Sequence, residues 1–203
     1  MNNYFHKIHK FDIDEKRLYE EFLHVATKHD IFERTKKFIE ENKGIEFYKT
    51  YYRLRINYPS NCKSDMDPVV IQGFTNRSDS DWGDYDIENI IDDFKDSYTS
   101  KIAKEVHDYI IGRYPEYKMS SVKYHVLAPR ASLTLHRDGI DVPRFFLSAN
   151  VPEGAYMQII DEKIPMHENG ALYKLICGAL HNPLNESDGY RVSMVFTVDV
   201  DKK

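Results

Sequence analysis

The hydrophobic pattern of this 203-residue chain changes character near residue 120. Before that point, apolar residues recur at helical spacing in residues 14–42 and 87–111. In the first stretch they share one helical face at Leu18, Phe22, Val25 and Ala26, and residues 31–39 suit a second, shorter helix or turn. Gly44 stops the first pattern, and Gly112 with Pro115 closes the second. Two helical regions are therefore predicted in the first half.

Shorter signals lie between these helical regions. Residues 47–58 alternate and are rich in aromatic side chains, which is typical of a strand, and residues 69–74 suit another short strand. Residues 75–86 form a polar stretch around Trp82. This stretch could be a lid over a binding site or an ordinary surface loop.

After residue 120 the pattern has a period of two residues, which is the period of strands. The predicted strands are 121–127, 131–137, 144–151, 155–160, 171–177 and 190–199, with proline and glycine between them. We expect a mainly β fold with N-terminal helices (α+β), namely a double-stranded β-helix, or cupin-like jelly roll, with helices outside one sheet. Residues 1–203 would be one domain, in which 1–120 give helical support and the first strands, and 121–200 the jelly-roll core.

Composition narrows the class of protein. Hydrophobic residues make up 41% of the chain, which is enough for a sizeable core. The net charge of −5 makes nucleic acid an unlikely partner. The polar N-terminus does not resemble a signal peptide, and no apolar run reaches the roughly 20 residues of a membrane helix. We expect a cytoplasmic protein without a membrane partner, in which Cys62 and Cys177 are free buried thiols.

Three residues of the strand half suggest a metal site. His136 and Asp138 are two residues apart, so on a strand both side chains point to the same side. Taken alone, this pair would more readily be a surface histidine beside an acid. His181, which follows another predicted strand, could complete a set of two histidines and one carboxylate. Such a set suits iron(II), because it leaves coordination positions open for a cosubstrate and oxygen.

The last predicted strand carries Arg191 and Ser193 on one face. An arginine and a serine on a core-like strand are costly unless they are paired. A guanidinium beside a hydroxyl is well matched to a carboxylate. The alternatives are an exposed arginine on a one-sided sheet or a buried pair with an acid of the protein.

The order H-x-D, a second histidine 45 residues on and R-x-S ten residues later resembles the iron(II)/2-oxoglutarate-dependent oxygenases. The likeness covers roughly residues 121–200 and is closest to the aspartyl/asparaginyl β-hydroxylase branch with its bacterial proline-hydroxylase relatives. Two further stretches support this likeness, namely "RFFLSANVPEG" and "RVSMVFTVDV".

This resemblance implies roles for six residues. His136, Asp138 and His181 would be the metal ligands and form the catalytic centre. Arg191 and Ser193 would bind the distal carboxylate of 2-oxoglutarate, and Arg144 would help to hold the cosubstrate or an acidic substrate group. Asp138 departs from the animal β-hydroxylases, which lack this metal carboxylate, and disfavours a halogenase. Phe146 stands where those enzymes often have a polar residue near the cosubstrate.

The resulting hypothesis is an enzyme that uses iron(II), 2-oxoglutarate and O2 to hydroxylate an amino acid, free or within a peptide. Succinate and CO2 would be released. A cupin-type metal enzyme that does not use 2-oxoglutarate would not need Arg191 and Ser193. A non-catalytic jelly-roll binding module would not need three converging ligands.

Overall fold

The computed structural model describes residues 3–41, 51–59, 69–70, 85–138 and 142–200. Most of the described strands lie in two antiparallel sheets. The larger sheet has the order β1 (Phe5–Lys10), β11 (Ala171–Ile176), β8 (Pro143–Asn150), β13 (Arg191–Val200), β6 (Tyr117–Leu127), β2 (Tyr51–Arg55), β4 (Val69–Val70). The smaller sheet has the order β10 (Glu162–Pro165), β9 (Ala155–Ile159), β12 (His181–Asn185), β7 (Ala131–Ser132). The strands β3 (Asn57–Pro59) and β5 (Tyr85–Ile90) form a separate pair.

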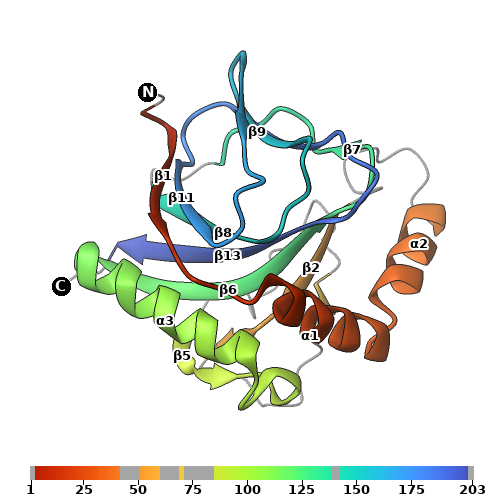
Figure 1. Ribbon diagram of the computed structural model, residues 1–203, viewed down its shortest axis with the longest axis horizontal. Helices are drawn as coiled ribbons and strands as arrows, with labels where there is room; N and C mark the ends of the chain where they lie inside the picture. The colour runs from red at the N-terminus through yellow and green to blue at the C-terminus, as the bar shows by residue number, and fades with distance from the viewer. Residues whose placement is uncertain (1–2, 42–50, 60–68, 71–84, 139–141, 201–203) are drawn as a thin grey trace.

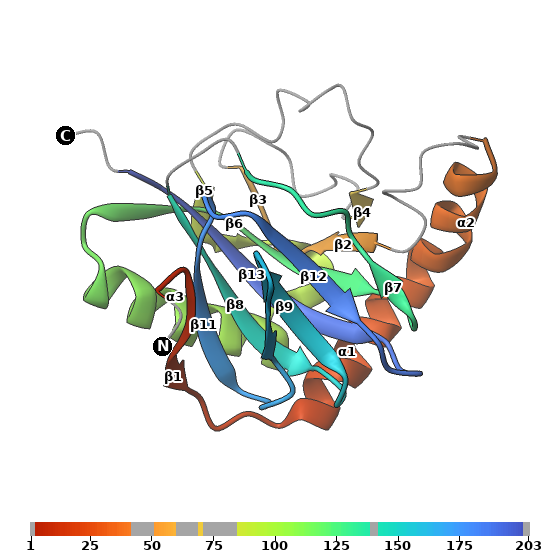
Figure 2. The same ribbon diagram turned by 90° about the horizontal axis from the view of Figure 1, so that it is seen from above.

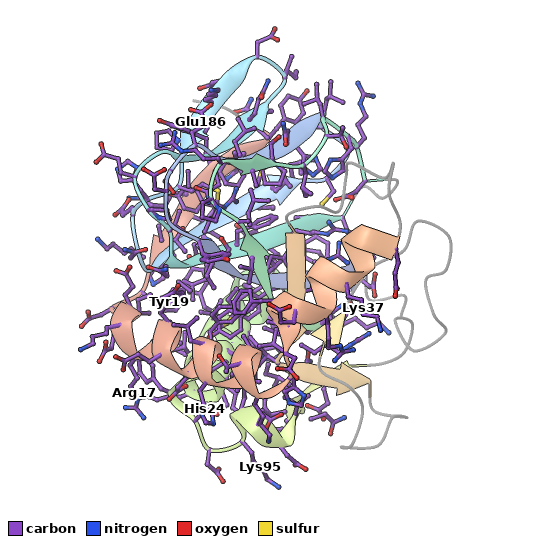
Figure 3. All side chains as sticks on the ribbon, turned by 90° about the vertical axis from the view of Figure 1, so that its right-hand side faces the viewer. Arg17, Tyr19, His24, Lys37, Lys95 and Glu186 are labelled. Carbon is purple, nitrogen blue, oxygen red and sulfur yellow. The ribbon has the colours of Figure 1, made fainter. Side chains whose placement is uncertain are left out.

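The helices cover the outer face of the larger sheet. They are α1 (Glu15–Lys28), α2 (Ile31–Glu41) and α3 (Tyr98–Arg113), with a 3-10 turn, η3 (Asp92–Phe94), before α3. Figure 1 shows α1 and α3 below β6 and β13, while β7 and β9 lie above them. Figure 3 shows Arg17 and His24 on the outer side of α1 and Tyr19 on the side toward the sheets. This jelly roll with helices outside one sheet confirms the predicted fold class.

Alternation along β13 separates the two faces of the larger sheet. Val192, Met194, Phe196 and Val198 belong to the hydrophobic core beneath the helices. Val195 lies between Met194 and Phe196 and points to the opposite face, where it belongs to a second core with residues of β9 and β11. Because side chains alternate along a strand, Arg191 and Ser193 share the inner face with Val195. The view from above in Figure 2 shows β12 and β9 lying over β13 and β8.

Some sequence predictions need correction. Residues 87–111 are not one helix, because 85–90 form β5 and α3 begins at Tyr98. Ser97 caps α3, its side chain accepting a hydrogen bond from Ser100 N–H. Predicted strand 131–137 is regular only at β7 and has one further bridge at His136. The strands β1, β10 and β12 were not predicted.

Some of the remaining predictions are confirmed, and others fall on residues that the structure does not describe. Residues 14–42 do form two helices, α1 and α2. Cys177 is a free, buried thiol, as predicted. Cys62 and residues 75–84 of the possible lid at 75–86 lie outside the described residues, and residues 85–86 begin β5. Within the described part of the chain, no helix is long and apolar enough to cross a membrane.

Candidate metal centre and active site

His136 and His181 are held side by side by their own backbones. His136 N–H donates to His181 O at 3.0 Å, and His181 N–H donates to His136 O at 2.8 Å. This reciprocal pair attaches the segment after β7 to the first residue of β12. The two imidazole ring centroids are consequently 4.4 Å apart.

A backbone carbonyl fixes the orientation of each ring. His136 Nδ1 lies 2.7 Å from Thr134 O, and His181 Nδ1 lies 2.9 Å from Ala179 O. A carbonyl oxygen only accepts, so each Nδ1 carries a proton, and Nε2 is the ring atom left to bind a metal. This is the arrangement found in histidines that bind a metal through Nε2.

Asp138 completes the cluster. Its Oδ1 lies 3.9 Å from His136 Nε2, and its Oδ2 lies 3.7 Å from His181 Nε2. The potential ligand atoms of the three residues all lie within 4.8 Å of one another. Asp138 N–H donates to Cys177 O at 3.1 Å, which ties the backbone of Asp138 to the residue that follows β11. Two imidazoles and one carboxylate are a donor set that fits iron(II).

The environment keeps His181 in the form that binds a metal. Its side chain is only 4% exposed. Burial lowers the pKa of His181, and His136 and Arg144 lower it further, against the opposing effects of Ala179 O and Asp138. His181 is therefore neutral near pH 7. The Cys177 thiol is also kept neutral, because burial raises its pKa to about 12.

Arg144, at the start of β8, reaches this cluster directly. Its Nη1 lies 2.7 Å from Asp138 Oδ2, although the two atoms are not in hydrogen-bond geometry. Nε of Arg144 is buried and has no hydrogen-bond partner. The guanidinium thus compensates the charge of the carboxylate and retains a buried donor for another acceptor.

Arg191 and Ser193 are buried, with exposures of 4% and 2%. The Arg191 guanidinium reaches the smaller sheet, where it donates to Tyr156 O at 3.0 Å and Leu184 O at 3.4 Å. Leu184 is three residues from His181 on β12, which corresponds to about 10 Å along the strand. The Ser193 hydroxyl is buried without a hydrogen-bond partner. A carboxylate that extended from the metal cluster toward Arg191 would supply the acceptor that Ser193 lacks.

The sequence analysis did not place Arg53 and His125 beside this pair. Arg53 on β2 faces His125 on β6, and His125 faces Ser193 on β13. The three side chains form a row across the inner face. The sequence contained a signal for this row, because basic residues alternate with buried apolar ones in "YRLRI".

Comparison with known proteins gives a fold but no close relative. No family model and no curated protein matches the chain. Among solved structures, AviO1 from Streptomyces viridochromogenes Tue57 matches with a TM-score of 0.54 and 10% identity, over 98% of this chain and 90% of that one. The viral collagen prolyl hydroxylase of Paramecium Bursaria Chlorella virus-1 matches with a TM-score of 0.52 and 13% identity, over 98% and 91%. The non-heme monooxygenase ThoJ, in complex with nickel, matches with a TM-score of 0.52 and 8% identity, over 98% and 74%.

The chain shares its fold with these three proteins. At these identities the likeness is one of fold, and the chemistry is argued from the chain's own residues. The resemblance to the aspartyl/asparaginyl β-hydroxylase branch has no counterpart among these matches. Of the six residues singled out in the sequence, Arg144, Arg191 and Ser193 lie on the inner face of the larger sheet. His181 begins β12, and His136 and Asp138 lie in the irregular segment after β7.

Proposed function

We propose that the protein is an iron(II)- and 2-oxoglutarate-dependent oxygenase that hydroxylates an amino acid, free or within a peptide. The observation that carries the proposal is a buried arginine about 10 Å along β12 from a cluster of two histidines and one aspartate. This separation suits a short dicarboxylate that lies between the metal and Arg191.

Each part of the site has a task in this proposal. His136, Asp138 and His181 hold the metal, and the backbone carbonyls at their Nδ1 atoms keep both rings in position. Arg191 and Ser193 bind the distal carboxylate of 2-oxoglutarate. With oxygen, the bound iron and cosubstrate supply an oxidant for unactivated C–H bonds, and succinate and CO2 are the coproducts. The apolar core around Val195 excludes water from one side of the site.

A specific observation favours a cupin-type metal enzyme that does not use 2-oxoglutarate. Arg191 donates to backbone carbonyls and lies 3.0 Å from Met166 Sδ. These contacts could be a structural link between the two sheets. In that case the metal would bind, but 2-oxoglutarate would not.

The deciding experiment begins with the anaerobic protein, iron(II) and 2-oxoglutarate. We expect a visible charge-transfer band that needs both components, followed by succinate formation on adding oxygen and candidate amino acids or peptides. A protein that binds iron(II) without the band and without making succinate would refute the use of 2-oxoglutarate and favour the cupin-type enzyme.

A further inference from the structure

The segment after β7 forms an edge of the smaller sheet and carries a candidate metal ligand. Among the described strands, β7 is the last strand of this sheet and lies beside β12 (Figure 2). The chain continues along β12 beyond β7, because Leu133 N–H donates to Pro183 O at 3.2 Å and His136 pairs with His181. His136 is therefore a residue of the sheet edge itself.

The two neighbours of His136 are open to solvent. The side chain of Leu135 is 44% exposed, and Arg137 is exposed as well. Neither residue makes a hydrogen bond or an ion pair within the part of the chain that the structure describes. The edge at His136 is thus exposed on both sides of the metal ligand, and its main chain has groups left to bind a partner.

The pairing of His136 fixes the direction of these main-chain groups. In an antiparallel ladder a residue directs its N–H and its C=O to one side, and the next residue directs them to the other side. His136 exchanges both bonds with His181, and Asp138 N–H also points toward the barrel. The N–H and C=O groups of Leu135 and Arg137 therefore point away from β12. Two such pairs of groups, about 7 Å apart along the edge, match the main chain of an extended polypeptide.

An added strand would bring a side chain close to the metal cluster. The residue opposite His136 would form a pair without hydrogen bonds, in which the Cα atoms are about 4.5 Å apart and the side chains are closest. Its side chain would share the inner face with the His136 ring. The side chain of His136 is 26% exposed, although the His181 ring lies 4.4 Å from it on the β12 side. The added side chain would pass the other flank of the His136 ring.

We propose that the substrate is a residue within an extended polypeptide, which binds antiparallel to residues 135–137 as an additional strand and presents its side chain opposite His136 for oxidation. This inference rests on the proposed function and narrows its substrate to a residue in a polypeptide. A free amino acid cannot bond to both Leu135 and Arg137, because it is too short. One atom of O2 enters a C–H bond of the side chain as hydroxyl, and the other enters succinate as 2-oxoglutarate loses CO2.

The side chains that flank His136 predict the neighbours of the oxidised residue. Leu135 and Arg137 point to the face opposite His136, so they would contact the residues on either side of the oxidised one. In an antiparallel pairing, the preceding residue lies opposite Arg137 and the following residue lies opposite Leu135. Arg137 is an exposed cation that pairs with no acid among the described residues. We therefore expect an acidic residue before the oxidised one and an apolar residue after it.

The first test measures peptide binding to the full chain, loaded with Mn(II) and 2-oxoglutarate without oxygen. The probes are fluorescein-labelled heptapeptides Ser-Val-Glu-X-Leu-Val-Ser with X as asparagine, aspartate or proline, and binding is read as anisotropy. Lysine in place of the glutamate should weaken binding about threefold to tenfold. Arg137→Glu should reverse this preference. Arg113→Glu, at an exposed arginine in the last turn of α3, is the control and should keep it.

A second set of peptides tests the strand pairing. N-methylation of the residue before or after X removes a main-chain donor that faces the edge, so it should weaken binding at least about tenfold. N-methylation at X should be tolerated, because the N–H of X points away from the protein. Absence of binding by every peptide, an equal effect of N-methylation at all three positions, or a charge preference unaltered in Arg137→Glu would overturn the proposal.

Succinate formation separates this inference from the proposed function. We expect stimulation by the peptides and not by free asparagine, aspartate or proline. Equal stimulation by the free amino acids would overturn the inference and leave the oxygenase intact. If 2-oxoglutarate does not bind, the proposed function fails, and the anisotropy titrations with Mn(II) alone still test the edge. A wild-type dimer in sedimentation that Arg137→Glu dissociates would assign the edge to a second copy of the chain and would also overturn the inference.

Discussion

Arg144 lies 2.7 Å from Asp138 through its Nη1 and the Oδ2 of the carboxylate. The resemblance to known oxygenases assigned Arg144 to the cosubstrate or to an acidic substrate group. The contact gives it an additional task, since Asp138 is the carboxylate of the candidate metal site. A cation at Oδ2 fixes the carboxylate in one orientation and compensates its charge before the metal arrives.

Replacing Arg144 should therefore weaken metal binding, although Arg144 is not a ligand. We expect Arg144→Met to lower the affinity for Mn(II) or Ni(II) about tenfold, the lower end of the range for partners of metal ligands. Arg144→Lys keeps the charge without the planar fork and should be intermediate. Calorimetry measures both. Arg130→Met removes an exposed arginine paired with Asp188 and should leave the affinity unchanged. Wild-type affinity in Arg144→Met would show that Arg144 does not position Asp138.

The metal site itself is tested by removing ligands one at a time. Asp138→Ala and His181→Ala should abolish high-affinity binding of divalent metal, while circular dichroism shows a folded protein. His107→Ala, on the surface of α3, serves as the control. Retention of metal by both ligand variants would exclude this set of three ligands.

The cosubstrate pair is tested by graded variants. Arg191→Met should weaken 2-oxoglutarate binding about tenfold to a hundredfold, because a charged hydrogen bond contributes about 1.5–3 kcal/mol. Arg191→Lys should be intermediate, and Ser193→Ala should cost roughly tenfold or less. Metal affinity should hardly change in any of the three variants. Binding of 2-oxoglutarate by Arg191→Met as tightly as by the wild type would remove Arg191 from the cosubstrate site.

A stability prediction concerns the segment that leads into β11. Gly170 has a φ of +77°, and a Cβ there would lie 2.2 Å from Phe11 O. Gly170→Ala should therefore lower the free energy of unfolding by at least about 2 kcal/mol, from backbone strain and the displaced β1 connection. Gly112→Ala meets nothing within 4 Å and lies in α3, so it should stabilise by about 0.5–1 kcal/mol. Urea unfolding of both variants measures these changes in the free energy of unfolding. Equal unfolding midpoints for the two variants would contradict the prediction.

The sequence predicted the features that depend on short-range periodicity. Alternation along residues 190–199 correctly placed Arg191 and Ser193 on the face opposite Val192 and Met194. The pair of His136 and Asp138 and the later His181 do meet in space. Their spacing suggested a common site because strands of a jelly roll return to the same end.

Long-range pairing explains most of what the sequence did not predict. Ile87 and Ile90 fit a helical face, yet their segment pairs with β3, and Ile91 N–H donates to Ile56 O. The start of α3 is fixed by Ser97 and by Glu21, which accepts hydrogen bonds from the first amides of that helix. Glu21 belongs to α1, so no local pattern contains this information.

Polar strands were missed for a related reason. β1 consists largely of histidine and lysine and is held by pairing with β11. Pro183 in β12 argued against a strand, although its carbonyl accepts from Leu133 N–H. The ion pair of Arg144 with Asp138 likewise joins β8 to an irregular segment, and no sequence spacing predicts its 2.7 Å contact.

The mutual pairing of His136 and His181 bears on when a metal would enter the proposed site. The 44 residues between them include β8, β9, β10 and β11, so the two histidines meet only after the chain between them has been laid down. Closing so long a loop is slow and comes late in folding. Unlike a zinc finger, whose metal drives folding, this chain forms its backbone frame for the ligands with its own hydrogen bonds. In the proposed oxygenase, iron loading would then be a separate last event, and iron supply would set the active fraction of finished molecules rather than the number that fold.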